Sequence, residues 1–298
     1  MNYIFTHFSG LGMISEKNRG RLLIFFNSIL QNVKNSKVIF FTENSYKQIP
    51  HEIHDIIHKS NGQIEVYNVS YLNLNLNHNT KRYFYYLDYI NKNRLKLNEN
   101  DVFLHCDNTD LVFLDNIFDK LQLLKIKNKI NIFKEDKSNI LFKCDINSWW
   151  INNIDNSFLK KIGNNVVINS GTIISDSLSK FIDILTDISW YSLLYERKQP
   201  GKSYLMDQGI LNCLIYHNKL LLNTSVHDIQ LHQNEEPYLI YTMAHINEDG
   251  CRLVDRTLEY QNYTPCILHQ YDRKPTVTKF VSDLFLDDDY KHLCVDRE

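Results

Sequence analysis

Short apolar runs alternate with longer amphipathic segments through the first half of the chain. Residues 21–33 carry apolar side chains at the three- and four-residue spacing of one helix face, and residues 37–42 form a compact apolar run of strand length. We expect strands at residues 4–8, 37–42, 64–69, 102–104 and 130–133, and helices at residues 21–33, 52–58, 81–93 and 116–124. Strands that alternate with helices are typical of a parallel sheet with crossover helices. The pattern therefore predicts an α/β fold with a mostly parallel central sheet flanked by helices.

Three stretches of the second half combine an apolar run with polar groups. In residues 166–174, the triplet Asn169-Ser170-Gly171 interrupts two β-branched runs. A glycine inside a strand pattern predicts a bulge or a close approach of the backbone to a ligand. Asp207 has the form of a helix N-cap and is followed by Gln208, so an acid and an amide lie beside each other. A last apolar run ends in His269.

Two smaller features concern cations and aromatic side chains. Lys81 and Arg82 begin a predicted helix, where cations oppose the helix dipole, and such local conflicts often mark sites. This pair could meet an anionic ligand, and the alternative is solvated surface charge. We expect no regular element at residues 134–165, which are polar and irregular in pattern. Trp149 and Trp150 lie in this stretch, and we favour their packing in the core over stacking on a sugar ring.

Composition excludes several classes of protein. With 298 residues, of which 43% are hydrophobic, the chain can bury a full core. A net charge of −2 argues against a nucleic-acid partner. The apolar runs are too short to span a bilayer, and the N-terminus reads as a first strand and not as a signal peptide. Six scattered cysteines without a CxxC pair indicate reduced thiols, and hence a cytoplasmic protein, with peripheral membrane contact left open.

Two carboxylates follow the predicted strand at residues 102–104. Asp107 and Asp110 would lie at the rim of the sheet, where open α/β sheets bind ligands. Close carboxylates repel each other unless a cation lies between them, and hard oxygen ligands suit Mg²⁺ or Mn²⁺. The alternative is that both are turn residues before the helix that starts near Asn116. His269 is by itself an ordinary polar residue at a strand end, and it gains interest because the carboxylate pair lacks further ligands.

Four stretches, taken in order, resemble the motifs of glycosyltransferases with the GT-A fold. They are most like the glycogenin-type and lipopolysaccharide-galactosyltransferase-type group, and a similar pattern occurs in collagen-modifying enzymes. These stretches are residues 107–117, 169–171, 207–212 and 266–273, and the resemblance spans about residues 3–275. It implies one GT-A-like domain over residues 1–298, with a nucleotide-sugar-binding part at 1–135 and an acceptor-side part, including the C-terminal metal-ligand strand, at 136–298.

The same resemblance implies a role for each matching residue. The sequence departs from the family's DxD spacing, so Asp110 matches the last acid while Asp107 and Asn108 compete for the first place. The implied cofactor is Mn²⁺ or Mg²⁺, and its implied ligands are Asp107, Asp110 and His269. The implied catalytic residues, nearest the transferred sugar, are Asp207 and Gln208. The implied substrate-binding residues, which meet the sugar, the nucleotide or its phosphates, are Thr6, His7, Phe8, Arg82, Asn108, Asn169, Gly171 and Lys274.

The resemblance implies a metal-dependent glycosyltransferase. Such an enzyme moves a sugar from a nucleotide-sugar donor, here expected to be a UDP-sugar, to a hydroxyl group of a glycan or glycoconjugate acceptor. Two alternatives stay open. A metal-dependent phosphohydrolase would carry an acid on its first strand, whereas this strand ends in Thr6 and His7. A non-catalytic relative would keep the fold and bind carbohydrate, and the presence of Asp110 and His269 argues against it.

Overall fold

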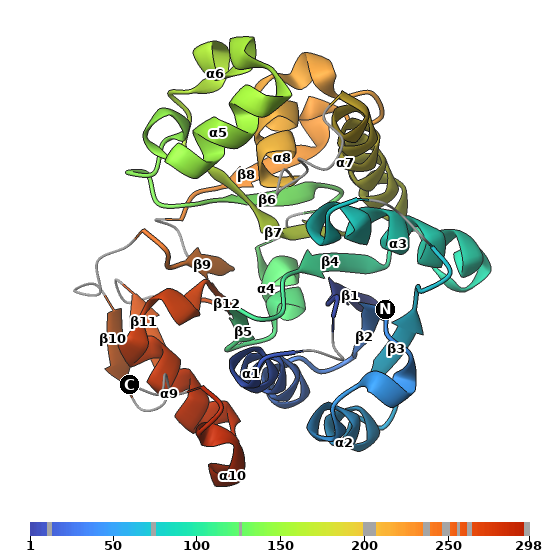
Figure 1. Ribbon diagram of the computed structural model, residues 1–298, viewed down its shortest axis with the longest axis vertical. Coiled ribbons are helices and arrows are strands. Elements are labelled where there is room, and N and C mark those ends of the chain that lie inside the picture. Colours follow the sequence, from blue (N-terminus) through green and yellow to red (C-terminus); the bar gives the residue numbers. More distant parts are fainter. Residues whose placement is uncertain are drawn as a thin grey trace. The chain divides into compact units, whose positions relative to one another are not determined.

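A computed structural model of the 298-residue chain gives the fold (Figure 1). It describes residues 1–10, 14–72, 76–124, 127–198, 207–234, 239–245, 251–254, 257–260 and 264–294. The strands are β1 (Asn2–His7), β2 (Ser36–Thr42), β3 (Ile64–Asn68), β4 (Val102–Cys106), β5 (Leu111–Phe113), β6 (Ile130–Lys134), β7 (Ile168–Ser175), β8 (Ile229–His232), β9 (Ile240–Thr242), β10 (Cys251–Val254), β11 (Thr257–Tyr260) and β12 (Ile267–His269). The helices are α1 (Glu16–Asn32), α2 (His51–Lys59), α3 (His78–Lys92), α4 (Ile117–Leu123), α5 (Asp145–Ile154), α6 (Asn156–Ile162), α7 (Leu178–Lys198), α8 (Asp207–Tyr216), α9 (Pro275–Phe285) and α10 (Asp288–Lys291).

The main sheet has seven strands in the order β3-β2-β1-β4-β7-β6-β8. β1 pairs in parallel with β2, β2 with β3, and β6 with β8, whereas β6 and β7 are antiparallel. A second sheet has the order β5-β12-β9, and β10 pairs with β11. The predicted α/β fold with a mostly parallel central sheet flanked by helices is therefore confirmed.

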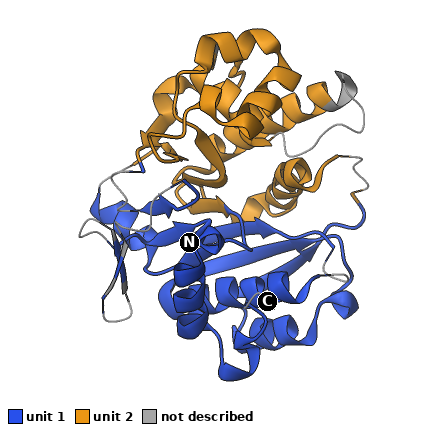
Figure 2. Cartoon of the chain, turned by 60° about the vertical axis from the view of Figure 1, so that its left-hand side comes forward, with its two compact units in different colours: residues 1–71, 106–126, 234–298 blue, residues 72–105, 127–233 orange. Residues whose placement is uncertain are grey.

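The chain divides into two compact units, each built from separate segments (Figure 2). Unit 1 consists of residues 1–71, 106–126 and 234–298, and unit 2 of residues 72–105 and 127–233. The expectation of one domain with a donor part and an acceptor part that meet near residue 135 stays a prediction.

Apolar packing between α1 and its strands forms the core of unit 1. Ser15 caps α1 by accepting a hydrogen bond from the Asn18 N–H, which starts the helix five residues before the predicted position. The buried ring of Phe26 on this helix meets Phe40 of β2 edge to face, with 5.1 Å between the ring centroids. Gly20 lets the end of the described chain approach α1, because a Cβ there would lie 2.7 Å from the Cys294 sulfur.

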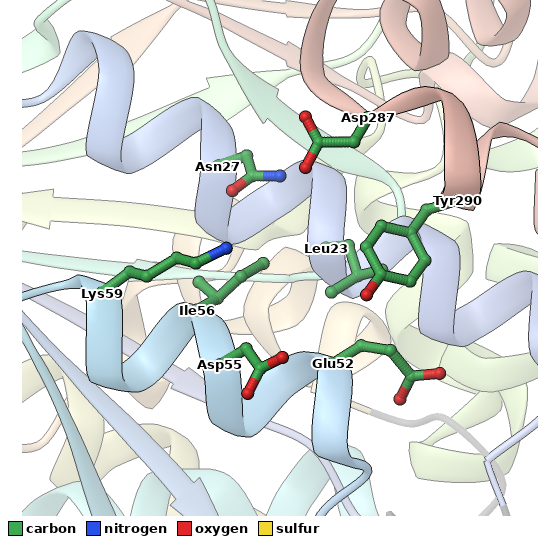
Figure 3. Close-up of a pocket in the computed structure, with 8 residues that line it drawn as sticks. All are labelled: Leu23, Asn27, Glu52, Asp55, Ile56, Lys59, Asp287 and Tyr290. Atoms are coloured by element: carbon green, nitrogen blue, oxygen red, sulfur yellow. The ribbon is translucent and has the colours of Figure 1, made fainter.

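A small pocket of unit 1 lies among α1, α2 and the segment of α10 (Figure 3). Its lining mixes three carboxylates with one lysine, an amide and apolar groups: Leu23, Asn27, Glu52, Asp55, Ile56, Lys59, Asp287 and Tyr290. None of the residues predicted to bind substrate or metal lines this pocket, so it is not the predicted site.

Helices α5, α6 and α7 pack around α8 and β7 in unit 2 (Figure 1). The prediction of no regular element at residues 134–165 was wrong, because α5 and α6 occupy most of it. Trp149 was also wrongly expected in the core: its side chain is 50% exposed. Trp150 packs inward instead, and a Cβ on Gly209 of α8 would lie 2.8 Å from the Trp150 Cβ.

No helix within the described ranges has both the length and the apolar character needed to cross a membrane.

Candidate active site: an acidic cluster and an amide cluster

The acidic cluster of unit 1 forms where two distant strands pair. β4 ends at Cys106, a short turn carries Asp107 and Asp110, and β5 begins at Leu111. β12 pairs antiparallel with β5, with His269 opposite Leu111. Directly after His269, the Gln270 N–H donates to the Asp110 carbonyl at 2.6 Å. This pairing carries His269 to the two carboxylates across about 160 residues of sequence, which no local pattern could reveal.

Gln270 turns the chain away from the acidic cluster directly after His269. Its φ of 56° lies in the left-handed region, which few residues other than glycine adopt. The following 3₁₀ turn (Tyr271–Arg273) is tied to α1, because Arg21 donates to the Asp272 carboxylate at 2.8 Å. Burial raises the pKa of Asp272, as does the nearby charge of Asp110, while Arg21 opposes both. The segment that follows His269 is thus held by Asp110 at its start and by Arg21 at its turn.

Side-chain geometry within this cluster fits a divalent cation. The His269 Nε2 lies 3.5 Å from Asp107 Oδ2 and 3.6 Å from Asp110 Oδ1. One ligand atom from each residue lies within 4.8 Å of the other two. Three donors around one ion, each about 2.0–2.2 Å from it, have separations of this order. Both ring nitrogens of His269 are buried and make no hydrogen bond to any residue that the structure describes. The donor set of two carboxylates and one imidazole suits Mn²⁺ better than Mg²⁺.

The charges of the acidic cluster also favour a cation. Burial alone would lower the pKa of His269, but the carboxylates of Asp110 and Asp107 outweigh it and raise that pKa to about 10. A positive charge is therefore strongly favoured between these carboxylates. In the absence of a metal the proton on the imidazole supplies it, and a divalent cation would replace that proton.

The structure distinguishes between the two candidates for the first motif position. Asn108 is 4% exposed, and its side-chain amide donates to the carbonyl of His7 at 3.1 Å. Asp107, in contrast, lies beside His269. The geometry therefore groups Asp107, and not Asn108, with the other two candidate ligands, and Asn108 ties the acidic turn to the end of β1.

Four further predicted site residues also belong to unit 1. Thr6 is fully buried in β1, and the Phe8 N–H just beyond that strand donates to the Phe41 carbonyl at 3.1 Å. His7 lies 3.7 Å from the Glu43 carboxylate. Lys274 is half-buried at the N-cap of α9. Their predicted contacts with a substrate stay predictions.

The amide cluster of unit 2 is centred on Asp207, which begins α8. Its Oδ2 accepts hydrogen bonds from Arg82 at 2.7 Å, from the Ser170 hydroxyl at 3.0 Å and from the Tyr83 hydroxyl at 3.2 Å. The side chains of Arg82 and Asp207 are only 6% and 3% exposed. The alternative of solvated surface charge for Arg82 was therefore wrong. Helix α3 begins at His78 behind the cap Asn77, which places Arg82 in the second turn and leaves little conflict with the helix dipole.

Gln208 is held on three sides. Its amide nitrogen donates to Asn147 Oδ1 at 3.1 Å and lies 3.5 Å from Glu135 Oε1. Its amide oxygen accepts from the Ser170 N–H at 3.3 Å. Asn212, one helical turn further along α8, exchanges two hydrogen bonds with the backbone of Ile168 at 2.9 and 2.8 Å. Asn212 thereby fixes the start of α8 beside β7.

Asn169 belongs to the same cluster through a carboxylate that sequence reasoning missed. The Asn169 amide nitrogen donates to Glu135 Oε1 at 3.1 Å, and its amide oxygen accepts from the Gly171 N–H at 2.7 Å. Glu135 is 3% exposed and directly follows β6. A carboxylate after a strand was the signal used for Asp107, and it could have identified Glu135 as well. Asn147 gave no such signal, because α5 was not predicted.

The predicted site residues fall into two groups, one in each unit. Unit 1 holds Thr6, His7, Phe8, Asp107, Asn108, Asp110, His269 and Lys274. Unit 2 holds Arg82, Asn169, Gly171, Asp207 and Gln208. The contacts within each group are as described above, and the assigned roles stay predictions.

Comparison with known proteins identifies the fold. No protein-family model and no curated protein sequence matches the chain. Among solved structures, apo mouse xyloside xylosyltransferase 1 is similar with a TM-score of 0.51 and 13% identity, over 90% of this chain and 97% of that chain. The glycosyltransferase GlyE of Streptococcus pneumoniae TIGR4 gives a TM-score of 0.51 and 11% identity, over 98% of this chain but 62% of that chain. The fold is GT-A-like, as predicted from the sequence.

Proposed function

We propose that this protein is a metal-dependent glycosyltransferase that moves a sugar from a nucleotide-sugar donor to a hydroxyl group of a glycan or another acceptor. The observation that carries this proposal is the convergence of His269 on Asp107 and Asp110 in a fold similar to that of solved glycosyltransferases. Each motif alone is common in proteins, whereas a buried imidazole brought to two carboxylates from a distant strand is a specific arrangement.

Asp107, Asp110 and His269 would hold Mn²⁺ or Mg²⁺. A bound divalent cation supplies electrostatic stabilisation of the diphosphate leaving group. The imidazole of His269 favours Mn²⁺. Lys274, near the start of α9, is the proposed source of further positive charge for the phosphates.

The amide cluster would bind the transferred sugar. Sugars present many hydroxyl groups, and a rigid set of amides and carboxylates can read their positions through hydrogen bonds. Asn169 and Gln208 supply the amides, and Asp207 supplies a carboxylate whose charge is neutralised by Arg82. Because the Arg82 guanidinium is paired with Asp207, we assign Arg82 to the orientation of that carboxylate in the donor site.

The donor is proposed to be a UDP-sugar. The name of the mouse protein indicates xylosyl transfer to a xyloside, so both pentoses and hexoses belong in a test. A cytoplasmic location and peripheral contact with a membrane stay predictions.

A panel of UDP-, GDP- and CDP-sugars with MnCl₂ tests the proposal. The true donor should raise the unfolding temperature, since a ligand at 100 times its Kd stabilises a folded protein by about 2.7 kcal/mol. The same donor should be hydrolysed slowly, or transferred to a glycoside acceptor. Asp110→Ala should lose both effects, whereas Asp115→Ala, which changes an exposed acid of the same stretch, should keep them.

Three outcomes would contradict the proposal. Hydrolysis of generic phosphate esters without turnover of any nucleotide sugar would indicate a phosphohydrolase. Binding of a nucleotide sugar or glycan without turnover would indicate a non-catalytic relative. Wild-type turnover by a folded Asp110→Ala protein would refute the metal site.

A further inference from the structure

One residue of unit 2 contacts both proposed catalytic side chains. The hydroxyl group of Ser170 donates to Asp207 at 3.0 Å, and its N–H donates to the amide oxygen of Gln208 at 3.3 Å. The next peptide along the chain contacts the third sugar-binding candidate, because the Gly171 N–H donates to Asn169 Oδ1 at 2.7 Å. The position of this short stretch of chain therefore contributes to the orientation of three side chains.

The backbone at this point is partly released from the sheet. β6 and β7 are in register at Ile132 with Ile173 and at Lys134 with Ile168. Between these pairs, the single residue Phe133 of β6 faces residues 169–172 of β7. Such a bulge leaves backbone groups without partners in that ladder and re-aims side chains, which suits a binding site. Contacts other than the β6 ladder therefore matter for the peptide that follows Ser170.

β4 is the other neighbour of β7 in this sheet (Figure 1), and its residue His105 contacts that peptide. His105 is fully buried, and its Nε2 lies 3.1 Å from the Ser170 carbonyl oxygen. A carbonyl can only accept, so Nε2 carries the proton and donates it. The Nδ1 lies 3.2 Å from the hydroxyl of Tyr86, which donates to it when the imidazole is neutral. Tyr86 and the carbonyl together select one tautomer and one ring orientation.

We infer that His105 is a positioning residue for the sugar-binding face. Tyr86 orients the imidazole, and the imidazole holds the carbonyl of Ser170. Ser170 contacts the side chains of Asp207 and Gln208, and the Gly171 N–H contacts that of Asn169. The role rests on the proposed function, and it assigns His105 no contact with the substrate. The sequence analysis assigned His105 no role, because the predicted strand ended at residue 104.

Three substitutions separate positioning from general structural support. His105→Leu removes both hydrogen bonds, His105→Gln keeps a side-chain N–H near the position of Nε2, and Tyr86→Phe removes the hydroxyl that selects the tautomer. A half-buried histidine of the same unit provides the control: His232 of β8 shares a hydrogen bond of 2.9 Å with Asn131 and stacks on Phe133. His232→Leu should cost stability while it leaves the contacts among Tyr86, His105 and Ser170 in place.

The expected readout is a split between kcat and KM for the nucleotide sugar identified by the donor panel. His105→Leu should lower kcat by about 10- to 100-fold, the range that follows from small misplacement of reacting groups. KM for the donor should change less than kcat, because the proposed metal ligands, which would hold the diphosphate, lie in unit 1 and are unchanged. His105→Gln should recover most of kcat, and Tyr86→Phe should fall between wild type and His105→Leu. Mn²⁺ affinity, measured by titration calorimetry, should stay at the wild-type value in all four variants.

Several results would overturn the inference. A folded His105→Leu protein with wild-type kcat would do so, as would equal losses in His105→Gln and His105→Leu, or an equal loss in His232→Leu. If the wild-type protein turns over no nucleotide sugar, the proposed function fails, and crystal structures of the two His105 variants then decide the positioning role. Amides of Asn169 and Gln208 that stay in place in His105→Leu would refute it, and movement that His105→Gln reverses would support it.

Discussion

Removing the charge of Arg82 should destabilise the protein far more than removing an ordinary surface cation. Arg82 and Asp207 form a 2.7 Å ion pair with side chains 6% and 3% exposed. Arg82→Met keeps an apolar stem of similar length and leaves the Asp207 carboxylate buried, with only the Tyr83 and Ser170 hydroxyls still donating to its Oδ2. Breaking a buried pair in this way costs about 3–5 kcal/mol, whereas exposed pairs contribute at most about 1 kcal/mol.

The magnitude can be measured with a matched control on the same helix. Lys92 pairs with Asp88 at 3.2 Å, but the Lys92 side chain is 48% exposed. Urea unfolding, followed by circular dichroism and tryptophan fluorescence, gives the free energy of unfolding for Arg82→Met and Lys92→Met. We expect a loss of about 3–5 kcal/mol for the first and less than about 0.5 kcal/mol for the second.

A double-mutant cycle identifies the origin of the loss. Asp207→Asn removes the buried charge at nearly constant shape, so Arg82→Met combined with Asp207→Asn should be more stable than Arg82→Met alone. Two results would refute the reasoning from burial. One is a loss of unfolding free energy in Arg82→Met no larger than in Lys92→Met. The other is a double variant that is less stable than Arg82→Met by the full loss measured for Asp207→Asn alone.

Three further predictions concern unit 1. Asp110→Ala should remain folded but lose the stabilisation that MnCl₂ gives, and EDTA should remove the same stabilisation from Asp115→Ala and wild type, as a thermal-shift assay can check. Without metal, the pKa of His269 is raised from 6.5 to about 10, so its contribution to stability is complete below pH 6.5 and is lost as the pH rises towards 10. Urea titrations in EDTA between pH 6 and 10 should show this slope, and His269→Gln should flatten it. Gly20→Ala should cost about 1–3 kcal/mol in the same titrations, because its Cβ would lie 2.7 Å from the Cys294 sulfur, and an unchanged midpoint would contradict that contact.

The sequence was sufficient for the outline of the fold because its main signals are local. Apolar spacing predicted α1 within a few residues, and the missing turn is explained by the cap at Ser15, whose effect begins before the apolar pattern does. The two helices between β6 and β7 were missed because of their composition. α5 is rich in asparagine, which favours turns and caps over helix interiors, and this composition outweighed the helical spacing of its apolar residues.

Contacts between distant residues set the limit of prediction at the candidate site. The choice between Asp107 and Asn108 depends on the bond from Asn108 to the His7 carbonyl, across 101 residues. The burial of Arg82 depends on Asp207, 125 residues away. Neither partner can be found from spacing or propensity, since both contacts arise only when strands and helices pack. His269 could be proposed only because its neighbours resemble a motif.

β12, which carries His269, is the middle strand of its three-stranded sheet. This has a consequence for the order of events during synthesis. β5 and β9 both lack a partner in this sheet until residues 267–269 have emerged from the ribosome. During translation, two strand edges therefore wait unpaired, which exposes them to pairing with other chains. Closure of this sheet also brings His269 to Asp107 and Asp110, so a nascent chain would lack the third proposed cation ligand until β12 has paired.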